Sequence, residues 1–209
     1  MKLFSYVVAR DFGFAPNPFY GFCTLATCKP KIRVTVAIGD WVVGTGSSKY
    51  GLRGHIVFAM RVAEILTYDR YWRDSRFLPK RPNLRGSLKQ AFGDNIYHRN
   101  LRTGRWVQIN SHHSHVDGSP NAANIRHDTQ TEKVLIATEF VYWGAHGPKI
   151  PKRFMKQRER HVCTVRGHKC NFHPDFSASF LRWVQSHDER GYVGAPAEFP
   201  RELLKSKKL

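Results

Sequence analysis

A cluster of histidines is the part of this sequence whose residue types and spacing are best suited to chemistry. His112, His113, His115 and Asp117 fall within six positions of the polar stretch 110–119. Neutral imidazole is a ligand for zinc, iron or nickel, and Asp117 would complete a metal set. In an extended segment only His113 and His115 point to the same side. Three roles therefore stay open: a metal site, proton transfer to a substrate, or a polar loop whose histidines bond to backbone groups.

Two shorter pairs are also candidates. His168 and Lys169 follow Arg166 in a basic segment, so they fit either phosphate contact or, for His168, acid-base catalysis near neutral pH. Arg10 and Asp11 end the first expected strand, where they would either face a ligand or form an ion pair that ends the strand.

Several enzyme classes lack their signatures in this chain. There is no nucleophile elbow, no cysteine and histidine in a known local context, and no zinc-deaminase motif. An enzyme is not excluded, because catalytic partners usually meet in space and not in sequence. The four cysteines, at positions 23, 28, 163 and 170, suit free thiols in a reducing compartment. They would otherwise be zinc ligands together with nearby histidines, but their spacing fits no compact zinc finger. We expect no cofactor and no resident metal.

Positive charge is concentrated in two segments. The formal net charge is +18, and residues 70–105 hold ten Lys or Arg against Asp74 and Asp94, while residues 149–170 hold eight against Glu159. Aromatic residues are interleaved with the first of these segments. Lys and Arg neutralise phosphates and aromatic rings stack on exposed bases, so this composition predicts a nucleic-acid or modified-nucleotide partner. Between the nucleic acids we favour DNA over RNA. The candidate phosphate-binding residues are Lys49, Arg85, Lys89, Arg166 and Lys169.

The elements that must position these residues are mostly strands. The segments 2–9, 41–43, 56–66, 106–109, 133–137 and 140–143 have strand patterns, and Gly44–Gly54 reads as a hairpin connection. Pro174 begins the clearest helix, in which Phe176, Phe180, Leu181 and Val184 repeat at helical spacing. No dinucleotide fingerprint or phosphate-loop motif is present.

These patterns predict an α+β chain with a mixed, mostly antiparallel β-barrel, flanking helices and long basic loops. We expect a single domain over residues 1–200 and a basic tail over 201–209. The amino terminus lacks a secretory signal and no apolar run is long enough to cross a membrane, so the expected location is the cytoplasm.

The sequence also resembles known families. Residues 39–46 and 55–62, followed by the aromatic segment 68–72, look like PUA-like and EVE-type barrels, which bind bases or modified bases. A narrower set of blocks resembles the nucleotide modification associated domain, type two. These blocks are residues 5–19, 23–30, 89–98, 140–144 and 166–169. The resemblance covers most of the chain and implies a role tied to modified nucleotides without naming a reaction.

Two main functional hypotheses follow, beside a third in which the protein is a nucleic-acid-associated scaffold that binds partner proteins through its aromatic loop, residues 12–22. In the first, the protein reads a modified base in a barrel pocket, where the base stacks on an aromatic ring and amides or acids test its edge. The residues predicted for this pocket are Arg10, Asp11, Asn17, Asp40, Trp41, Tyr71, Asn95 and Trp143. In the second, the protein is an enzyme acting on modified nucleotides or DNA, with His113, His115, Asp117 and His168 as its catalytic residues. The sequence does not determine the oligomeric state.

Overall fold

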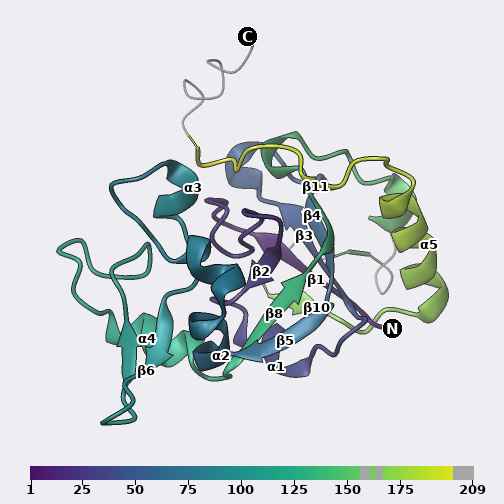
Figure 1. Ribbon diagram of the computed structural model, residues 1–209. Helices are drawn as coiled ribbons and strands as arrows, with labels where there is room; N and C mark the ends of the chain where they lie inside the picture. Colours follow the sequence, from purple (N-terminus) through teal and green to yellow (C-terminus); the bar gives the residue numbers. More distant parts are fainter. Residues whose placement is uncertain (156–160, 163–166, 200–209) are drawn as a thin grey trace. The chain divides into compact units, whose positions relative to one another are not determined.

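The computed structural model describes residues 1–155, 161–162 and 167–199, and the chain divides into two compact units (Figure 1). The first unit comprises residues 1–12, 36–63 and 137–209, and the second comprises residues 13–35 and 64–136. The chain therefore passes from one unit to the other four times.

A six-stranded sheet forms the centre of the first unit, in the order β10-β1-β3-β4-β9-β11. Parallel pairing joins β1 to β3 and β9 to β11, and the other neighbours are antiparallel. The strands are β1 Leu3–Val8, β3 Trp41–Gly46, β4 Ile56–Arg61, β9 Glu139–Tyr142, β10 His168–Lys169 and β11 Gly191–Tyr192. Short 3-10 turns lie at η1 Ser48–Tyr50, η3 Gly144–His146 and η4 Lys152–Phe154.

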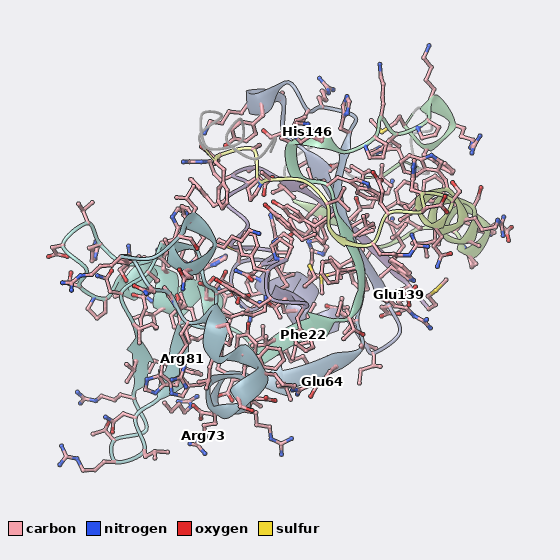
Figure 2. All side chains as sticks on the ribbon, turned by 45° about the horizontal axis from the view of Figure 1, so that its top comes forward. Phe22, Glu64, Arg73, Arg81, Glu139 and His146 are labelled. Carbon is pink, nitrogen blue, oxygen red and sulfur yellow. The ribbon has the colours of Figure 1, made fainter. Side chains whose placement is uncertain are left out.

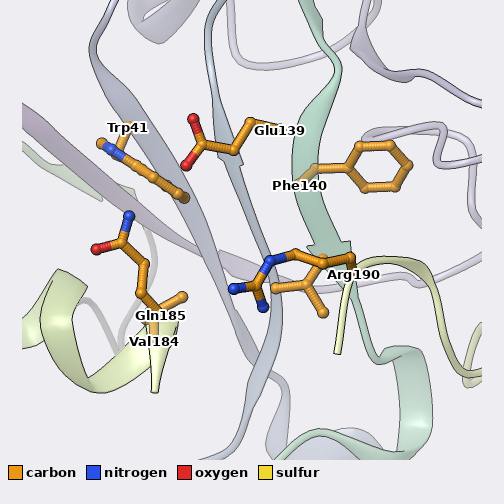
Figure 3. Close-up of a pocket in the computed structure, with 7 residues that line it drawn as sticks. Trp41, Glu139, Phe140, Val184, Gln185 and Arg190 are labelled. Atoms are coloured by element: carbon orange, nitrogen blue, oxygen red, sulfur yellow. The ribbon is translucent and has the colours of Figure 1, made fainter. Parts of the chain in front are cut away.

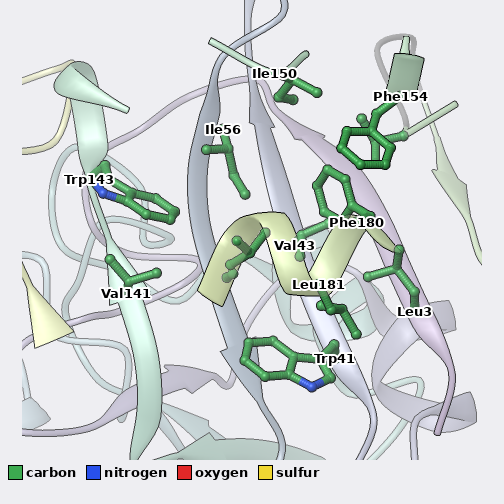
Figure 4. Close-up of a cluster of buried hydrophobic side chains, with 13 residues drawn as sticks. Leu3, Trp41, Val43, Ile56, Val141, Trp143, Ile150, Phe154, Phe180 and Leu181 are labelled. Carbon is green, nitrogen blue, oxygen red and sulfur yellow. The ribbon is translucent and has the colours of Figure 1, made fainter. Parts of the chain in front are cut away.

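Helix α5 (Pro174–Gln185) packs its apolar stripe on one face of this sheet. His173 caps the helix and Pro174 occupies its first turn, where a missing N–H costs nothing. Phe180 and Leu181 lie over Leu3 and Trp41 in a buried cluster (Figure 4). On the sheet itself, a Cβ at Gly44 would lie 2.2 Å from the ring of Phe58, so only glycine fits there. The sequence pattern at 174–185 thus correctly predicts a core helix.

The second unit contains short helices around small sheets. A three-stranded sheet has the order β2-β8-β5, and β6 and β7 form a separate antiparallel pair. Its strands are β2 Cys23–Leu25, β5 Glu64–Thr67, β6 Tyr97–Arg99, β7 Trp106–Gln108 and β8 Lys133–Ala137. Its helices are α1 Pro30–Thr35, α2 Tyr68–Arg73, η2 Ser75–Lys80, α3 Leu88–Ala91 and α4 Ala122–Asp128.

The predicted α+β class and the mostly antiparallel pairing are confirmed, but the described strands do not close into a barrel. The expected strand over 56–66 is divided. Val62 and Ala63 separate β4 from β5, which belong to different sheets. Because both pieces are apolar and β-branched, their composition gives no sign of the break. None of the helices in the described ranges is long and apolar enough to cross a membrane.

Candidate active site

Three side chains of the second unit form a hydrogen-bonded series around one imidazole. Nε2 of His113 lies 3.7 Å from Sγ of Cys28, and Nδ1 of His113 lies 2.8 Å from Oδ2 of Asp128. The imidazole therefore lies between a thiol and a carboxylate and contacts each through a different nitrogen. This is the arrangement of a nucleophile, a base and an orienting acid.

His113 is held on every side. Its carbonyl oxygen accepts hydrogen bonds from Asn124 Nδ2 at 2.8 Å and from Gln108 Nε2 at 3.2 Å, and its backbone N–H donates to the hydroxyl of Ser111. The ring of Phe14 lies 4.6 Å from the imidazole ring. Fixed backbone and side-chain contacts restrict the imidazole to one orientation, which is what proton transfer needs.

Asp128 is fully buried at the end of α4, where its carboxylate accepts several hydrogen bonds. Besides His113, the donors are the backbone N–H of Cys28 at 2.8 Å, Tyr97 Oη at 3.0 Å and His127 Nδ1 at 3.2 Å. One carboxylate thus orients the imidazole of His113 and holds the backbone of Cys28.

Arg33 binds the backbone of both Cys28 and Asp128. Its guanidinium is fully buried and donates to the carbonyl oxygen of Cys28 at 2.9 Å and to the carbonyl oxygen of Asp128. It also donates to the hydroxyl of Tyr68 at 2.9 Å and to the carbonyl oxygen of Lys133 at 2.8 Å. The planar, five-donor guanidinium suits this role, because a lysine ammonium cannot reach four fixed acceptors in one plane.

Cys28 lies in strained backbone directly before α1. Its φ is 56° and that of Lys29 is 43°, both in the left-handed region that non-glycine residues rarely adopt. Such conformations persist only where the surroundings over-determine them, and they occur often at active sites. Here the contacts from Arg33 and Asp128 supply that constraint and leave the thiol half-buried.

The electrostatics favour a charged pair on His113 and Asp128. Burial lowers the pKa of His113, but its hydrogen bonds to Asp128 and Cys28 outweigh burial and raise the pKa to about 9. Burial raises the pKa of Asp128, yet the bonds from His113 and the backbone of Cys28 hold it below its ordinary value. At neutral pH the imidazole is therefore protonated and the carboxylate ionised.

The same three groups are also possible metal ligands. One ligand atom from each of Cys28, His113 and Asp128 lies within 4.8 Å of the others. A metal, however, needs all three donor atoms directed at a common centre. His113 instead directs one nitrogen at the sulfur and the other at the carboxylate. The observed geometry fits nucleophilic catalysis better than it fits a metal centre.

The predicted catalytic residues have different surroundings, and their catalytic role stays a prediction. Among the residues around the histidine cluster, His113 turns inward, while His115 is exposed and Asp117 accepts hydrogen bonds from Ser119. His168 belongs to the first unit, where it pairs with Tyr6 across β10 and β1. The carboxylate that pairs with His113 is Asp128, not Asp117.

Most residues predicted for base binding are buried and bonded within their own unit. In the second unit, Asn17 binds Lys80 and Phe92, and Tyr71 donates to Asp94. The amide of Asn95 donates to backbone carbonyl oxygens.

The first unit holds the other predicted base-binding residues. Asp11 accepts from Tyr142, Asp40 from the backbone of Lys2, and Trp143 donates to Glu189. Arg10 donates to Glu198.

Trp41, another predicted base-binding residue, lines a cavity. This cavity of about 190 Å³ lies within the first unit (Figure 3). Glu139, Gln185 and Arg190 contribute its polar groups. Base binding at Trp41 stays a prediction.

The predicted phosphate-binding residues have varied surroundings. Lys49 forms an ion pair with Glu198 at 2.9 Å. Burial raises the pKa of Glu198, but bonds from Tyr50, Lys49 and Arg10 lower it to about 2. Arg85 is exposed, whereas Lys89 lies 5.8 Å from the ring of Phe19 and Lys169 lies 5.4 Å from that of Phe172. Arg166 lies outside the described residues, as do Cys163 and the tail 201–209. Phosphate binding by these residues stays a prediction.

Comparison with known proteins supports the resemblance noted in the sequence. The model of the family described as nucleotide modification associated domain 2 matches residues 1–203. The chain belongs to this family. Neither the curated proteins nor the solved structures include a match. Membership in the nucleotide modification associated domain 2 family ties the protein to modified nucleotides.

Two residues of this site, Cys28 and Asp128, are not predicted from the sequence. The sequence pattern indicates a free thiol or a zinc ligand at Cys28, and it indicates no role for Asp128. Cys28 and His113 are 85 positions apart in the chain, so no local pattern joins them. One signal was available: Cys28 is a polar, reactive residue between a buried strand and Pro30, where a helix begins.

Proposed function

We propose that this nucleotide modification associated domain 2 protein is a thiol-dependent enzyme acting on nucleotides that carry a modified base. The observation that supports this most strongly is the series from Cys28 through His113 to Asp128, at 3.7 Å and 2.8 Å. The family match supports the substrate class.

In this proposal Cys28 is the nucleophile and His113 the general acid-base. The imidazolium of His113 stabilises the thiolate of Cys28. The sulfur attacks an electrophilic carbon of the substrate, and His113 then gives its proton to the departing group. Water attacks the carbon bound to sulfur, His113 accepts one proton from that water, and the thiolate is released. Asp128 orients the imidazole and stabilises its charge throughout, without itself taking up a proton.

Replacing the nucleophile tests the proposal. Cys28→Ser should reduce turnover by about 1,000-fold or more, because a hydroxyl is a far weaker nucleophile than a thiolate. The assay incubates the protein with nucleotides and oligonucleotides carrying methylated, hydroxymethylated, glycosylated or deazaguanine bases and follows their masses. Cys170→Ser is the matched control, since Cys170 is an exposed thiol of the first unit.

Two outcomes would contradict the proposal. Turnover that survives in Cys28→Ser but not in His113→Gln would show that Cys28 is not the nucleophile. Turnover that a chelator abolishes and zinc restores would move the site to metal chemistry, using the same three residues.

A second candidate function is base reading in the first unit, favoured by the cavity at Trp41. The cavity has a volume of about 190 Å³ and is lined by an aromatic ring, a carboxylate, an amide and a guanidinium. The ring can stack on a base, and the polar groups can form hydrogen bonds to its edge. Trp41→Phe should then weaken the preference for modified over plain oligonucleotides while salt-sensitive binding persists. Equal preference in both proteins would exclude the cavity as a reading pocket.

A further inference from the structure

The hairpin formed by β6 and β7 is a two-stranded ribbon in the second unit. It pairs with no other described strand, and its turn, residues 100–105, is exposed throughout. Figure 1 shows this turn extending beyond β6, away from the helices of the same unit. Leu101 in this turn is 85% exposed, and the exposed residues Arg102 and Arg105 follow it in the chain.

Several contacts fix the shape of this turn. The side-chain oxygen of Asn100 accepts the backbone N–H groups of Arg102 and Thr103, each at 3.0 Å. The guanidinium of Arg99 lies 4.0 Å from the ring centre of Trp106 and donates to the carbonyl oxygen of Gly104 at 3.0 Å and to Glu132 at 2.6 Å. The turn therefore presents Leu101, Arg102 and Arg105 on a preformed ribbon.

The charged side chains of the ribbon itself are all basic, and the acidic groups that contact it, Glu132 and Asp69, both bind at Arg99. No Asp or Glu occurs between residues 95 and 116. Helix α2 joins the ribbon through a 2.7 Å hydrogen bond from the backbone N–H of Arg99 to Asp69, and it carries the exposed residues Arg70 and Arg73. Figure 2 labels Arg73 in this unit. Such a surface attracts a polyanion.

The aromatic rings near the ribbon are already covered by the protein. The guanidinium of Arg81 lies 3.6 Å from the ring centre of Trp72, and the ring of His98 stacks on Trp72 at 4.3 Å. Two groups this close to one ring must occupy opposite faces. Arg99 covers one face of Trp106, and the ring of Tyr68 meets Trp106 edge-to-face at 5.5 Å. Trp72 therefore offers no free face to an unpaired base and Trp106 offers at most one, which argues against a single strand as the partner.

We propose that the β6–β7 hairpin binds duplex DNA. The ribbon enters the major groove, which admits a two-stranded ribbon, while Arg102 and Arg105 contact phosphates on its walls and Leu101 contacts base edges. A-form RNA has a major groove too narrow for this contact. This binding is independent of the thiol chemistry proposed above, because none of its residues belongs to the site around Cys28.

A salt titration with matched variants tests the hairpin. We expect the Arg102→Gln/Arg105→Gln protein to bind a duplex DNA of about 20 base pairs at least about 10-fold more weakly at 0.1 M salt. The slope of log K against log salt should fall by about 1.8, because two phosphate contacts are lost. Leu101→Ser should weaken duplex binding without changing that slope. The control, Arg53→Gln/Arg182→Gln, removes the same charge from exposed positions of the first unit.

Clear results would overturn the proposal. Equal weakening in the hairpin variant and the control would show that only total charge matters. Tighter binding of the same sequence as a single strand or as duplex RNA would show that the partner is not duplex DNA. Because the assay measures binding alone, either failure leaves the proposal for Cys28 untouched, and loss of turnover in Cys28→Ser leaves the hairpin untouched.

Discussion

His113 is the residue on which the proposed chemistry depends, and its environment sets its charge. The ordinary pKa of a histidine is 6.5, and in the folded protein the pKa is raised to about 9. Between pH 6.5 and about pH 9, the folded state therefore keeps a proton that the unfolded state has released. The protonated ring carries an N–H on each nitrogen, one directed at the carboxylate of Asp128 and the other at the sulfur of Cys28.

This shift predicts how stability depends on pH. A raised pKa stabilises the fold fully below pH 6.5, and the contribution is lost as the pH rises through about 9. The whole contribution is about 3 kcal/mol. Urea unfolding of the wild type and of His113→Gln from below pH 6.5 to above pH 9 would measure it, since the difference between the two proteins isolates His113. A difference that stays constant with pH would show that folding does not shift the pKa of His113.

At the same scale, the sequence identified only part of the site. The crowding of imidazoles at 112–115 singled out His113, and the structure places it at the centre of the site. Cys28 and Asp128 come from opposite ends of the second unit's sequence and meet because Arg33 binds the backbone of both. No sequence pattern predicts that Arg33 is buried and bound to carbonyl oxygens, because the sequence of a basic protein contains many other arginines.

At the scale of elements, long apolar runs with a clear period predict helices and strands correctly. The strands β1 and β8 and the helix α5 lie where their apolar runs indicated, since each run is long enough to define its period. The barrel was wrong, because the break at Val62 and Ala63 sends β4 and β5 into separate sheets. Strand composition predicts pairing but not which partner a strand takes.

Helix α5 provides a direct test of how the first unit is stabilised. Phe180 is fully buried, and its ring centre lies 5.2 Å from that of Phe154 and 5.4 Å from that of Trp183. Phe180→Ala should lower the free energy of unfolding by about 3–5 kcal/mol, because it removes a large buried ring and leaves a cavity. Arg182→Ala, at an exposed position of the same helix, should change it by about 0.5 kcal/mol or less. Similar losses in both variants would mean that the stripe is not the core of this unit.

At the scale of the whole molecule, each unit has its own core and its own candidate activity. The second unit contains the Cys28 site and the basic ribbon, and the first contains the cavity at Trp41. The family model extends over both units, so family membership does not assign the function to one of them. The proposals make the second unit the place of chemistry and of DNA contact.

The measurement that tests the central claim most directly is the alkylation rate of Cys28 by iodoacetamide, located by peptide mass mapping. It needs no knowledge of the substrate. If His113 activates the thiol, the rate at neutral pH should be at least about 10-fold lower in His113→Gln than in the wild type. Cys170, followed in the same digests, should react equally in both proteins. An unchanged rate at Cys28 in His113→Gln would contradict the account, because the imidazole would then have no effect on the sulfur beside it.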